Sequence, residues 1–515
     1  MTEETLAKRF DLPVLEDVML CKLVRDRIPL VPYSFAKQKK ILPVEENERE
    51  CIIALSDPTD LEAIEELRLL LKRPLKMAYA SRSAIELAIE HCYRQKEGEA
   101  SKLITGVDAK ETASESPDDY DLLESKEENP IIRMVNAILL EAVQQGASDI
   151  HFEPTEEGLA IRYRIDGVLH RRHQPPRGIE LQLLTRIKVM AKLDIAEHRL
   201  PQDGRIKLKH GGRETDLRVS TLPTVHGERI VLRILDKGNI FLGLDQIGMD
   251  EPLLKEMRKL IRMPEGIVLV TGPTGSGKTT TLYSAIAEIN EPDTNIMTIE
   301  DPVEYKLNGI SQMNVNPRIE LDFAKGLRHI LRQDPDIIMI GEIRDRETAE
   351  IAIQASLTGH LVLSTLHTND APSALTRLAD MGIEPYLLAS SILGVLAQRL
   401  VRRICSDCQE AYAPTAEEMA ELKLKFSRTQ FHRGKGCEKC FLSGYRGRLG
   451  VYELMPVTSR IKTQVLKSQD SEELRKAALS QDMITLFSKG VELVRAGLTT
   501  SAEVLRVTRM VEEGV

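Results

Sequence analysis

Apolar residues follow two different periods along this chain, and each period predicts a different kind of sheet. In the third quarter of the chain, four apolar runs show no alternation with polar residues: "GIVLVT", "NIMTIED", "DIIMIGE" and "HLVLSTLH". A helical segment follows each run, which is typical of a parallel sheet covered by helices on both faces. We therefore expect a doubly wound α/β domain over residues 241–400.

The preceding region, residues 131–240, alternates apolar and polar positions after one helical segment, "IIRMVNAILLEAVQQG". Strand-like segments follow, including "SDIHFEP", "ETDLRVSTLP" and "GERIVLRILD", and the Asp166-Gly167 pair predicts a tight hairpin turn. Side chains alternate along a strand, so the apolar residues of the last segment face one side and Arg229 and Arg233 face the other. This pattern predicts a strand-rich α+β domain.

The two ends of the chain have their own patterns. Residues 1–95 alternate short strand-like runs with amphipathic helices, which predicts a small α/β domain. Residues 96–130 are expected to be a flexible linker, because they are rich in acidic residues and contain few large apolar ones. Residues 401–455 contain two close pairs of cysteines, and residues 456–515 have the pattern of a helical segment.

Composition narrows the class of protein. The 515 residues carry a net charge of -9, with 42% hydrophobic and 29% charged residues, which is typical of a globular protein with several domains. A net negative charge argues against nucleic acid as the main ligand, because phosphate contacts need a surplus of Lys and Arg. No apolar run reaches the roughly 18 residues that span a bilayer, and the acidic start has no signal-peptide pattern. We expect a cytoplasmic protein.

The run "GIVLVT" ends in a glycine-rich loop with the spacing G-x-x-x-x-G-K-[ST], and a helix is predicted immediately after the loop. Backbone N–H groups of such a loop surround phosphate oxygens, and the helix N-terminus adds a partial positive charge. Lys278 is expected to reach the β- and γ-phosphates of ATP, and the Thr279 hydroxyl is expected to hold Mg²⁺. The predicted nucleotide-binding residues are Gly272, Pro273, Thr274, Gly275, Ser276, Gly277, Lys278, Thr279 and Thr280.

Two acidic residues follow neighbouring apolar runs. Glu342 ends "DIIMIGE", where P-loop ATPases carry a carboxylate, although Gly341 stands where a metal-holding Asp is common. Glu300 lies in "TIEDPVEY". Both are expected at the sheet edge that carries the phosphate loop, and either is a candidate for orienting the attacking water. His360 and His367 flank the last run, and a buried structural role is an alternative for each.

Four of the seven cysteines form two C-x-x-C pairs, Cys405 with Cys408 and Cys437 with Cys440. Tetrahedral Zn²⁺ takes four thiolates at such spacing, and a site closed by four protein ligands is structural rather than catalytic. Unligated buried thiols and a redox pair are the alternatives. We expect a zinc element at this position.

The motifs "GPTGSGKTTTLY", "TIEDPVEY", "DIIMIGEIRDRETAE" and "LHTNDA", together with "SDIHFEP", "RLPQDGRI" and "DLRVSTLPTVHGERIVLRIL", closely resemble the type II secretion and type IV pilus family of traffic ATPases. The resemblance covers about residues 130–515. Retraction ATPases of this superfamily fit less well, because they lack the long N-terminal extension and the paired cysteines. The resemblance implies RecA-like ATPase domains in a homohexameric ring, which hydrolyses ATP to drive pseudopilus assembly and so power type II protein secretion.

The resemblance also assigns roles to single residues and to surfaces. "DPVEY" and "LHTND" match the family's Asp box and His box, which makes His367 a candidate sensor of the γ-phosphate. The family's phosphate-contacting arginines match Arg218 and Arg233, with Arg229 nearby. The resemblance further implies that residues 1–95, with the zinc element as a second surface, dock on inner-membrane secretion platform proteins. The protein would then be peripheral to the inner membrane, where acidic phospholipid is a further candidate partner.

Three other functions share parts of this pattern. Pilus extension and DNA uptake use a nearly identical catalytic core. A nucleic-acid motor would share the phosphate loop, but the net negative charge and the absence of Trp give no sign of a strand-binding groove. A nucleotide-gated scaffold without turnover is compatible with glycine at position 341.

Overall fold

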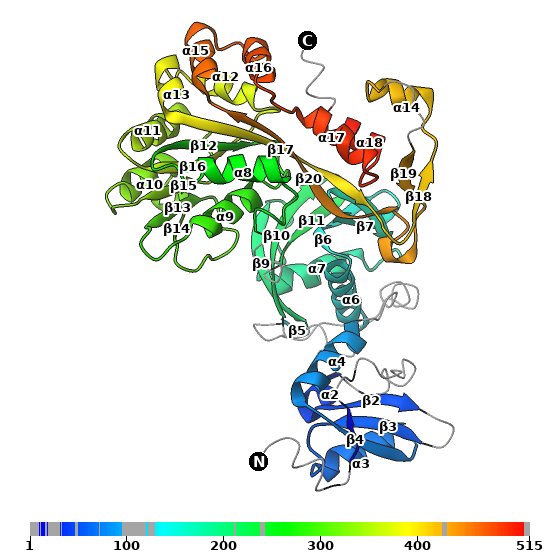
Figure 1. Cartoon of the computed structure of the whole chain (residues 1–515). Helices are drawn as coiled ribbons and strands as arrows, with labels where there is room; N and C mark the ends of the chain where they lie inside the picture. Colours follow the sequence, from blue (N-terminus) through cyan, green and yellow to red (C-terminus); the bar gives the residue numbers. More distant parts are fainter. Residues whose placement is uncertain are drawn as a thin grey trace. The chain divides into compact units, whose positions relative to one another are not determined.

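The computed structural model describes residues 10, 12–15, 18, 31, 33–46, 50–71, 73–94, 120–121, 129–210, 213–236, 243–424 and 430–508. The chain divides into two compact units, Met1–Gly238 and Asn239–Val515 (Figure 1). The predicted linker, residues 96–130, lies outside the described residues except for 120–121 and 129–130. Among the helices that are described, none combines the length and apolar character needed to cross a membrane.

The first unit begins with a four-stranded sheet in the spatial order β1, β4, β3, β2. Its elements are β1 (Val14–Leu15), α2 (Tyr33–Lys39), β2 (Ile41–Glu46), β3 (Cys51–Leu55), α3 (Leu61–Leu71), β4 (Leu75–Ala80) and α4 (Arg82–Arg94). β3 and β4 are parallel, whereas β2 and β3 are antiparallel. Leu67 of α3 and Ile85 of α4 are fully buried in one core with Ile53 of β3. Residues 1–95 therefore contain the α/β arrangement that their sequence pattern predicts.

A seven-stranded sheet follows in the order β5, β9, β10, β11, β6, β7, β8. Its elements are β5 (Tyr120–Asp121), α6 (Pro130–Gln144), β6 (Ala147–Thr155), β7 (Gly158–Ile165), β8 (Val168–His173), α7 (Glu180–Met190), β9 (Gln202–His210), β10 (Arg213–Thr224) and β11 (Gly227–Asp236). The apolar face packs on α6 and α7, where Ile187 meets Leu217 in one buried cluster. Asp166 and Gly167 have φ values of 49° and 84°, the left-handed conformations that a tight hairpin turn requires.

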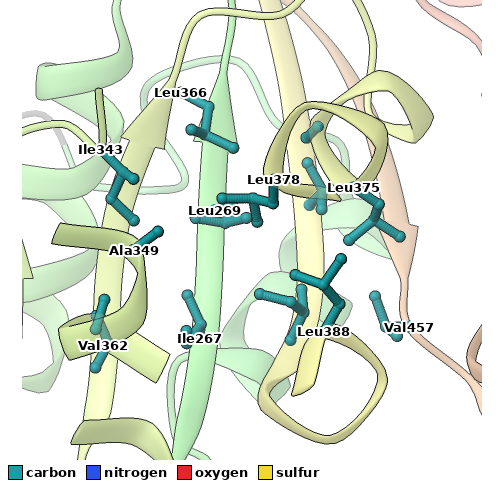
Figure 2. Packing of buried hydrophobic residues seen from close by; sticks show 14 of the residues in the cluster. Ile267, Leu269, Ile343, Ala349, Val362, Leu366, Leu375, Leu378, Leu388 and Val457 are labelled. Carbon is teal, nitrogen blue, oxygen red and sulfur yellow. The ribbon is translucent and has the colours of Figure 1, made fainter. Parts of the chain in front are cut away.

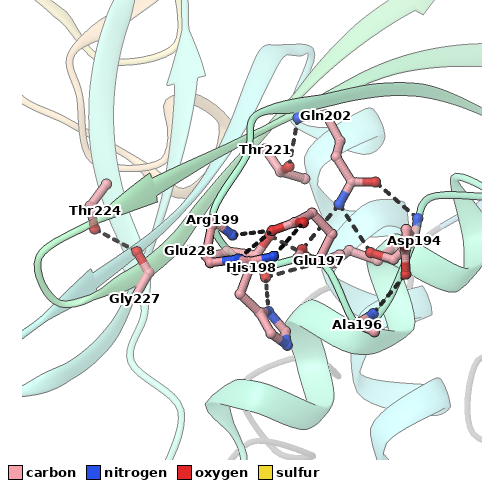
Figure 3. A network of polar contacts seen from close by, with 11 residues as sticks. Asp194, Ala196, Glu197, His198, Arg199, Gln202, Thr221, Thr224, Gly227 and Glu228 are labelled. Carbon is pink, nitrogen blue, oxygen red and sulfur yellow. Dashed lines mark hydrogen bonds and ion pairs between the residues drawn. The ribbon is translucent and has the colours of Figure 1, made fainter.

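A buried polar network joins the loop after α7 to the β10–β11 hairpin (Figure 3). The Nζ atom of Lys188, which is 1% exposed, donates to both carboxylate oxygens of Glu228 at 3.0 Å and to the carbonyl of Glu197 at 2.7 Å. The Nδ1 atom of His198 lies 2.7 Å from Glu228. Removing one partner of a buried ion pair typically costs about 3–5 kcal/mol. The network therefore holds in place the hairpin that carries the predicted phosphate-contacting arginines.

The second unit contains another seven-stranded sheet, in the order β14, β13, β15, β16, β12, β17, β20. The strands are β12 (Gly266–Thr271), β13 (Ile296–Glu300), β14 (Ser311–Asn314), β15 (Ile337–Ile340), β16 (Leu361–Leu366), β17 (Ile392–Ile404) and β20 (Tyr445–Pro456). Neighbouring strands are parallel except for β17 and β20, which are antiparallel. The four unalternating apolar runs form β12, β13, β15 and β16, as predicted, so the carboxyl ends of these strands meet at one edge.

Helices cover both faces of this sheet, because alternate residues of each strand face opposite sides. The described helices of the second unit are α8 (Glu251–Leu260), α9 (Lys278–Ile289), α10 (Phe323–Ile330), α11 (Arg346–Leu357), α12 (Pro372–Asp380), α13 (Pro385–Ser391), α14 (Ala416–Glu421), α15 (Ser459–Lys467), α16 (Ser471–Leu479), α17 (Leu486–Arg495) and α18 (Ser501–Thr508), of which α14 lies in the insertion between β17 and β20 rather than on the sheet. Ile267 and Leu269 of β12 pack with α10 to α13 (Figure 2), whereas Val268 and Val270 pack with α8 and α9.

The two long strands β17 and β20 continue the sheet past the predicted end of the α/β domain at residue 400. A hairpin of β18 (Gln409–Tyr412) and β19 (Phe431–Gly434) lies between them in sequence. The tetracysteine segment is therefore an insertion between two paired strands of the sheet.

Replacing Leu269 by alanine is expected to lower the free energy of unfolding of the second unit by about 2–5 kcal/mol. The reason is that Leu269 belongs to β12, the strand that leads into the phosphate loop, and its side chain, at 0% exposure, fills the core between this strand and the helices that cover it. Chemical denaturation followed by circular dichroism measures the change. The control Leu466→Ala, at a position that is 56% exposed, should change the value by less than about 0.5 kcal/mol. Equal losses in the two variants would contradict this packing.

Candidate active site

The phosphate loop connects β12 to α9, and its backbone requires glycine at both ends. Gly272 and Gly277 have φ values of 151° and 89°, which L side chains rarely adopt. A Cβ atom on Gly272 would also lie 2.6 Å from the carbonyl oxygen of Gln398. Residues 273–275 are exposed above this packed base. The loop therefore presents its backbone to solvent at the N-terminus of α9, which is a favourable place for an anion.

Lys278 is the first residue of α9, and its side chain folds back over the loop. Its Nζ atom donates to the carbonyl of Gly272 at 2.7 Å and to that of Pro273 at 3.2 Å. Burial lowers the pKa of Lys278 to about 8, the negative charge of Glu342 opposes this fall, and the positive charge of Arg399 adds to it. The charge of Glu342 thus acts on Lys278 within one site.

Glu342 follows β15 and contacts two basic side chains. One carboxylate oxygen lies 2.5 Å from Nη2 of Arg344, and the other lies 3.5 Å from Nε2 of His367. Burial, and next the charge of Lys278, lower the pKa of His367, which favours its neutral form. The structure thus brings Lys278, Glu342 and His367 together from three strand ends. Sequence reasoning did not identify Arg344, although it lies two residues after Glu342.

Glu300 occupies a different environment at the end of β13. It is 3% exposed, and its carboxylate accepts hydrogen bonds from the hydroxyl of Tyr283, from Thr298 Oγ1 at 2.6 Å and from Gln312 Nε2 at 3.1 Å. Burial raises the pKa of Glu300, against the effect of these hydrogen bonds. Because Tyr283 belongs to α9, the contact ties the helix after the phosphate loop to the "DPVEY" segment.

Thr279 and Thr280 are exposed in the first turn of α9. A hydroxyl oxygen is a hard ligand of the kind that Mg²⁺ prefers, so the exposed Thr279 beside Lys278 fits a metal ion bound with a triphosphate. His360 lies at the opposite end of β16 from His367, where its Nδ1 atom bonds with the carbonyl of Ala355 at 2.8 Å. His360 therefore has the structural role that was the alternative for it.

The predicted arginines lie on the charged face of the second sheet of the first unit. Arg218 of β10 is directly opposite Arg233 of β11, and on its other side it is opposite Arg205 of β9. The Nε atom of Arg233 lies 3.2 Å from Asp149, and its side chain is 61% exposed. On its far side Arg233 is directly opposite Asp149 of β6, so this row of three arginines ends at a carboxylate. Arg205 was not predicted, because the register that aligns it with Arg218 is a long-range property.

Four cysteine sulfur atoms converge where β17, β20 and the β18–β19 hairpin meet, all within 4.8 Å of one another. Cys405 and Cys437 are separated by 3.9 Å, Cys408 and Cys440 by 3.8 Å, and Cys437 and Cys440 by 3.7 Å. A tetrahedral zinc site with Zn–S distances near 2.3 Å has sulfur–sulfur edges of about 3.8 Å. Burial would raise the pKa of Cys440, but N–H groups of Cys437 and Gly444 bond with its sulfur and lower the pKa to about 7. The arrangement fits a closed zinc site.

Comparisons with known proteins identify the family and the fold of this chain. A family model described as "Type II/IV secretion system protein" matches residues 124–506, and one described as "MshEN domain" matches residues 10–99. Among solved structures, the Legionella pneumophila ATPase DotB superposes with a TM-score of 0.55 at 20% identity, covering 78% of this chain and 100% of that chain. At this level of identity the superposition supports the fold alone.

Two curated relatives match nearly the whole chain. "Type II secretion system protein E" of Dickeya dadantii is 48% identical over 486 residues, which are 93% of this chain and 97% of the relative. "Type II secretion system ATPase E" of Vibrio cholerae serotype O1 is 46% identical over 502 residues, which are 96% of this chain and 100% of the relative. The chain therefore belongs to the type II/IV secretion system protein family and, by similarity over nearly its whole length, to the family of type II secretion system protein E.

Proposed function

We propose that this protein is an ATPase motor that powers type II protein secretion. The observation that carries the proposal is the convergence of Lys278, Glu342 and His367 on the phosphate loop, at one edge of a parallel sheet. The loop supplies backbone donors for phosphate oxygens, and the carboxylate and imidazole supply groups that act on a water molecule. The names of the relatives, which include a secretion ATPase, support the same function.

In the proposed mechanism, the phosphate loop and Lys278 bind the triphosphate of ATP, and Thr279 holds Mg²⁺. The metal ion, when bound, neutralises developing charge on the phosphate oxygens. Glu342 orients a water molecule and accepts its proton as the water oxygen bonds to the γ-phosphorus and the bond to the β-phosphate oxygen breaks. His367 positions the carboxylate together with Arg344. Products are ADP and phosphate.

We assign Glu300 a positioning role rather than a direct role in catalysis. Its carboxylate is buried and accepts three hydrogen bonds, whereas Glu342 lies beside Lys278. Through Tyr283, Glu300 fixes the relation between α9 and the "DPVEY" segment. Arg218 and Arg233, which lie directly opposite each other on neighbouring strands, are proposed to stabilise charge on the transferring phosphoryl group.

The proposed motor is a homohexameric ring that acts at the cytoplasmic face of the inner membrane through partners. Residues 1–95 are the proposed docking domain for a platform protein, with the zinc element as a second surface. Movement of the ring would pass the energy of hydrolysis to the membrane-bound machinery as it assembles the pseudopilus. Acidic phospholipid is a proposed activator of the assembled ring.

Lys278→Ala is expected to lower kcat/KM for Mg²⁺-dependent ATP hydrolysis by about 10²-fold or more, because the phosphate loses its principal cation. Arg233→Ala is expected to lower it by roughly 10³-fold. Arg171→Ala is the matched control, because Arg171 is an exposed arginine of the same sheet that bonds with Gln174. A phosphate-release assay on the assembled ring measures all three variants. Full activity in Lys278→Ala, or stimulation by nucleic acid alone and not by acidic phospholipid, would contradict the proposed function.

ATP affinity is expected to fall as pH rises above 8, because Lys278 has a pKa of about 8 and binds phosphate in its protonated form. Above this pH the protein must take up a proton on binding, so the association constant falls towards a limit of about tenfold per pH unit. Titration calorimetry between pH 7 and pH 9.5 measures the effect. Lys278→Arg keeps its charge in this range and should show no such fall, so the same pH dependence in both proteins would rule out Lys278 as its source.

Zinc removal is expected to unfold the tetracysteine element but to leave the phosphate loop folded. Cys437→Ser should lower the affinity for zinc, because only three of the four thiolates remain to hold the metal. Metal analysis and the melting temperature measure the change. Cys51→Ala removes a buried thiol in another domain and should retain the metal. An unchanged zinc affinity in Cys437→Ser would exclude that cysteine as a ligand.

A further inference from the structure

The strand beside the phosphate-loop strand continues beneath the loop. β12 pairs in parallel with β17, and the last paired residues are Thr271 and Ala397. β12 ends there, whereas β17 continues to Ile404. Gln398, the next residue of β17, is 1% exposed and lies under the loop, since its carbonyl oxygen limits the space at Gly272. A polar side chain thus interrupts an apolar strand directly below the proposed phosphate site.

The Gln398 side chain bonds with two parts of the nucleotide-binding segment. Its Nε2 atom donates to the carbonyl of Ser276 at 2.6 Å, and its Oε1 atom accepts from Thr281 Oγ1 at 2.8 Å. Ser276 belongs to the loop, and Thr281 belongs to the first turn of α9. The two bonds use opposite ends of one amide, which fixes the side chain's orientation.

The bond to Ser276 determines which way the next N–H group points. In a planar trans peptide, the carbonyl and the following N–H point in opposite directions. Gln398 draws the Ser276 carbonyl towards the base of the loop, so the Gly277 N–H is directed away from that base. We propose that Gln398 is a positioning residue that orients the Gly277 N–H towards the phosphate of bound ATP. This role rests on the proposed function, because it concerns the same nucleotide site.

Gln398→Glu tests the role, because a carboxylate accepts from Thr281 as before but cannot donate to the Ser276 carbonyl. The measurement is the dissociation constant for ATP with Mg²⁺ in the full-length protein, expressed as the ratio of variant to wild type at each pH. At pH 8 the ratio is expected to be about ten. At pH 6 it should return towards one, since burial raises the pKa of a carboxyl group and a protonated carboxyl can donate. Wild-type glutamine does not titrate.

A matched control separates this effect from the general loss of a glutamine bond. Gln469 donates from Nε2 to the Val465 carbonyl at 2.7 Å at the end of α15, and Gln469→Glu should give a ratio near one at both pH values. Gln398→Met, which cannot donate at any pH, should give a raised ratio that does not change with pH. Gln398→Met is also the variant that tests the role if Gln398→Glu does not fold.

Two results would overturn the role of Gln398. One is a ratio near one at pH 8 in Gln398→Glu, or in Gln398→Met if only that variant folds. The other is a ratio in Gln398→Glu that is raised equally at pH 6 and pH 8, which would indicate a purely structural defect. Failure of the proposed function would be recognised separately, because wild type and Lys278→Ala would then bind ATP equally.

Discussion

A loop that turns its backbone N–H groups towards a phosphate must turn its carbonyl oxygens into the protein, where each needs a donor. In this chain four carbonyls of the loop have such donors. Lys278 Nζ donates to the carbonyls of Gly272 and Pro273, and Gln398 Nε2 donates to the carbonyl of Ser276. The carbonyl of Gly277 accepts a hydrogen bond from the N–H of Thr281, which is the first helical bond of α9. The anion site therefore depends on what lies beneath the loop as much as on the loop itself.

The donor beneath the loop comes from the part of β17 that extends past its neighbour β12. Beyond Gln398, the guanidinium of Arg399 donates to the carbonyl of Asn369 at 2.8 Å, in the segment after His367, and to that of Val507 in α18 at 3.4 Å. One strand thus connects the phosphate loop, the His367 segment and the C-terminal helices. Its antiparallel partner β20 makes the long strand possible, and the tetracysteine insertion joins the far ends of this pair.

Local patterns predicted most of the fold and part of the site. The phosphate loop and the cysteine pairs are short local motifs, the parallel-sheet rule was enough to place Glu342 at the same edge as Lys278, and the family resemblance pointed to His367. Contacts between distant residues were not predictable: Gln398 bonds with Ser276 across 122 residues, and Arg205 aligns with Arg218 only through strand register. The role of Glu300 was also not predictable. A sequence shows a carboxylate at a strand end, but it does not show the three side chains that donate hydrogen bonds to it. The lone glutamine within the apolar run "LGVLAQRLV" was the available signal for Gln398.

The central claim is that hydrolysis at Glu342, and not ATP binding alone, drives secretion. The most direct measurement is the amount of exported protein in the medium of a strain that lacks this gene and is complemented with wild type or with Glu342→Gln. Binding of ATP by the purified variant is measured in parallel. The account predicts that Glu342→Gln binds ATP but restores no secretion. Restored secretion by a variant that binds ATP without hydrolysing it would contradict the account and leave a nucleotide-gated scaffold in its place.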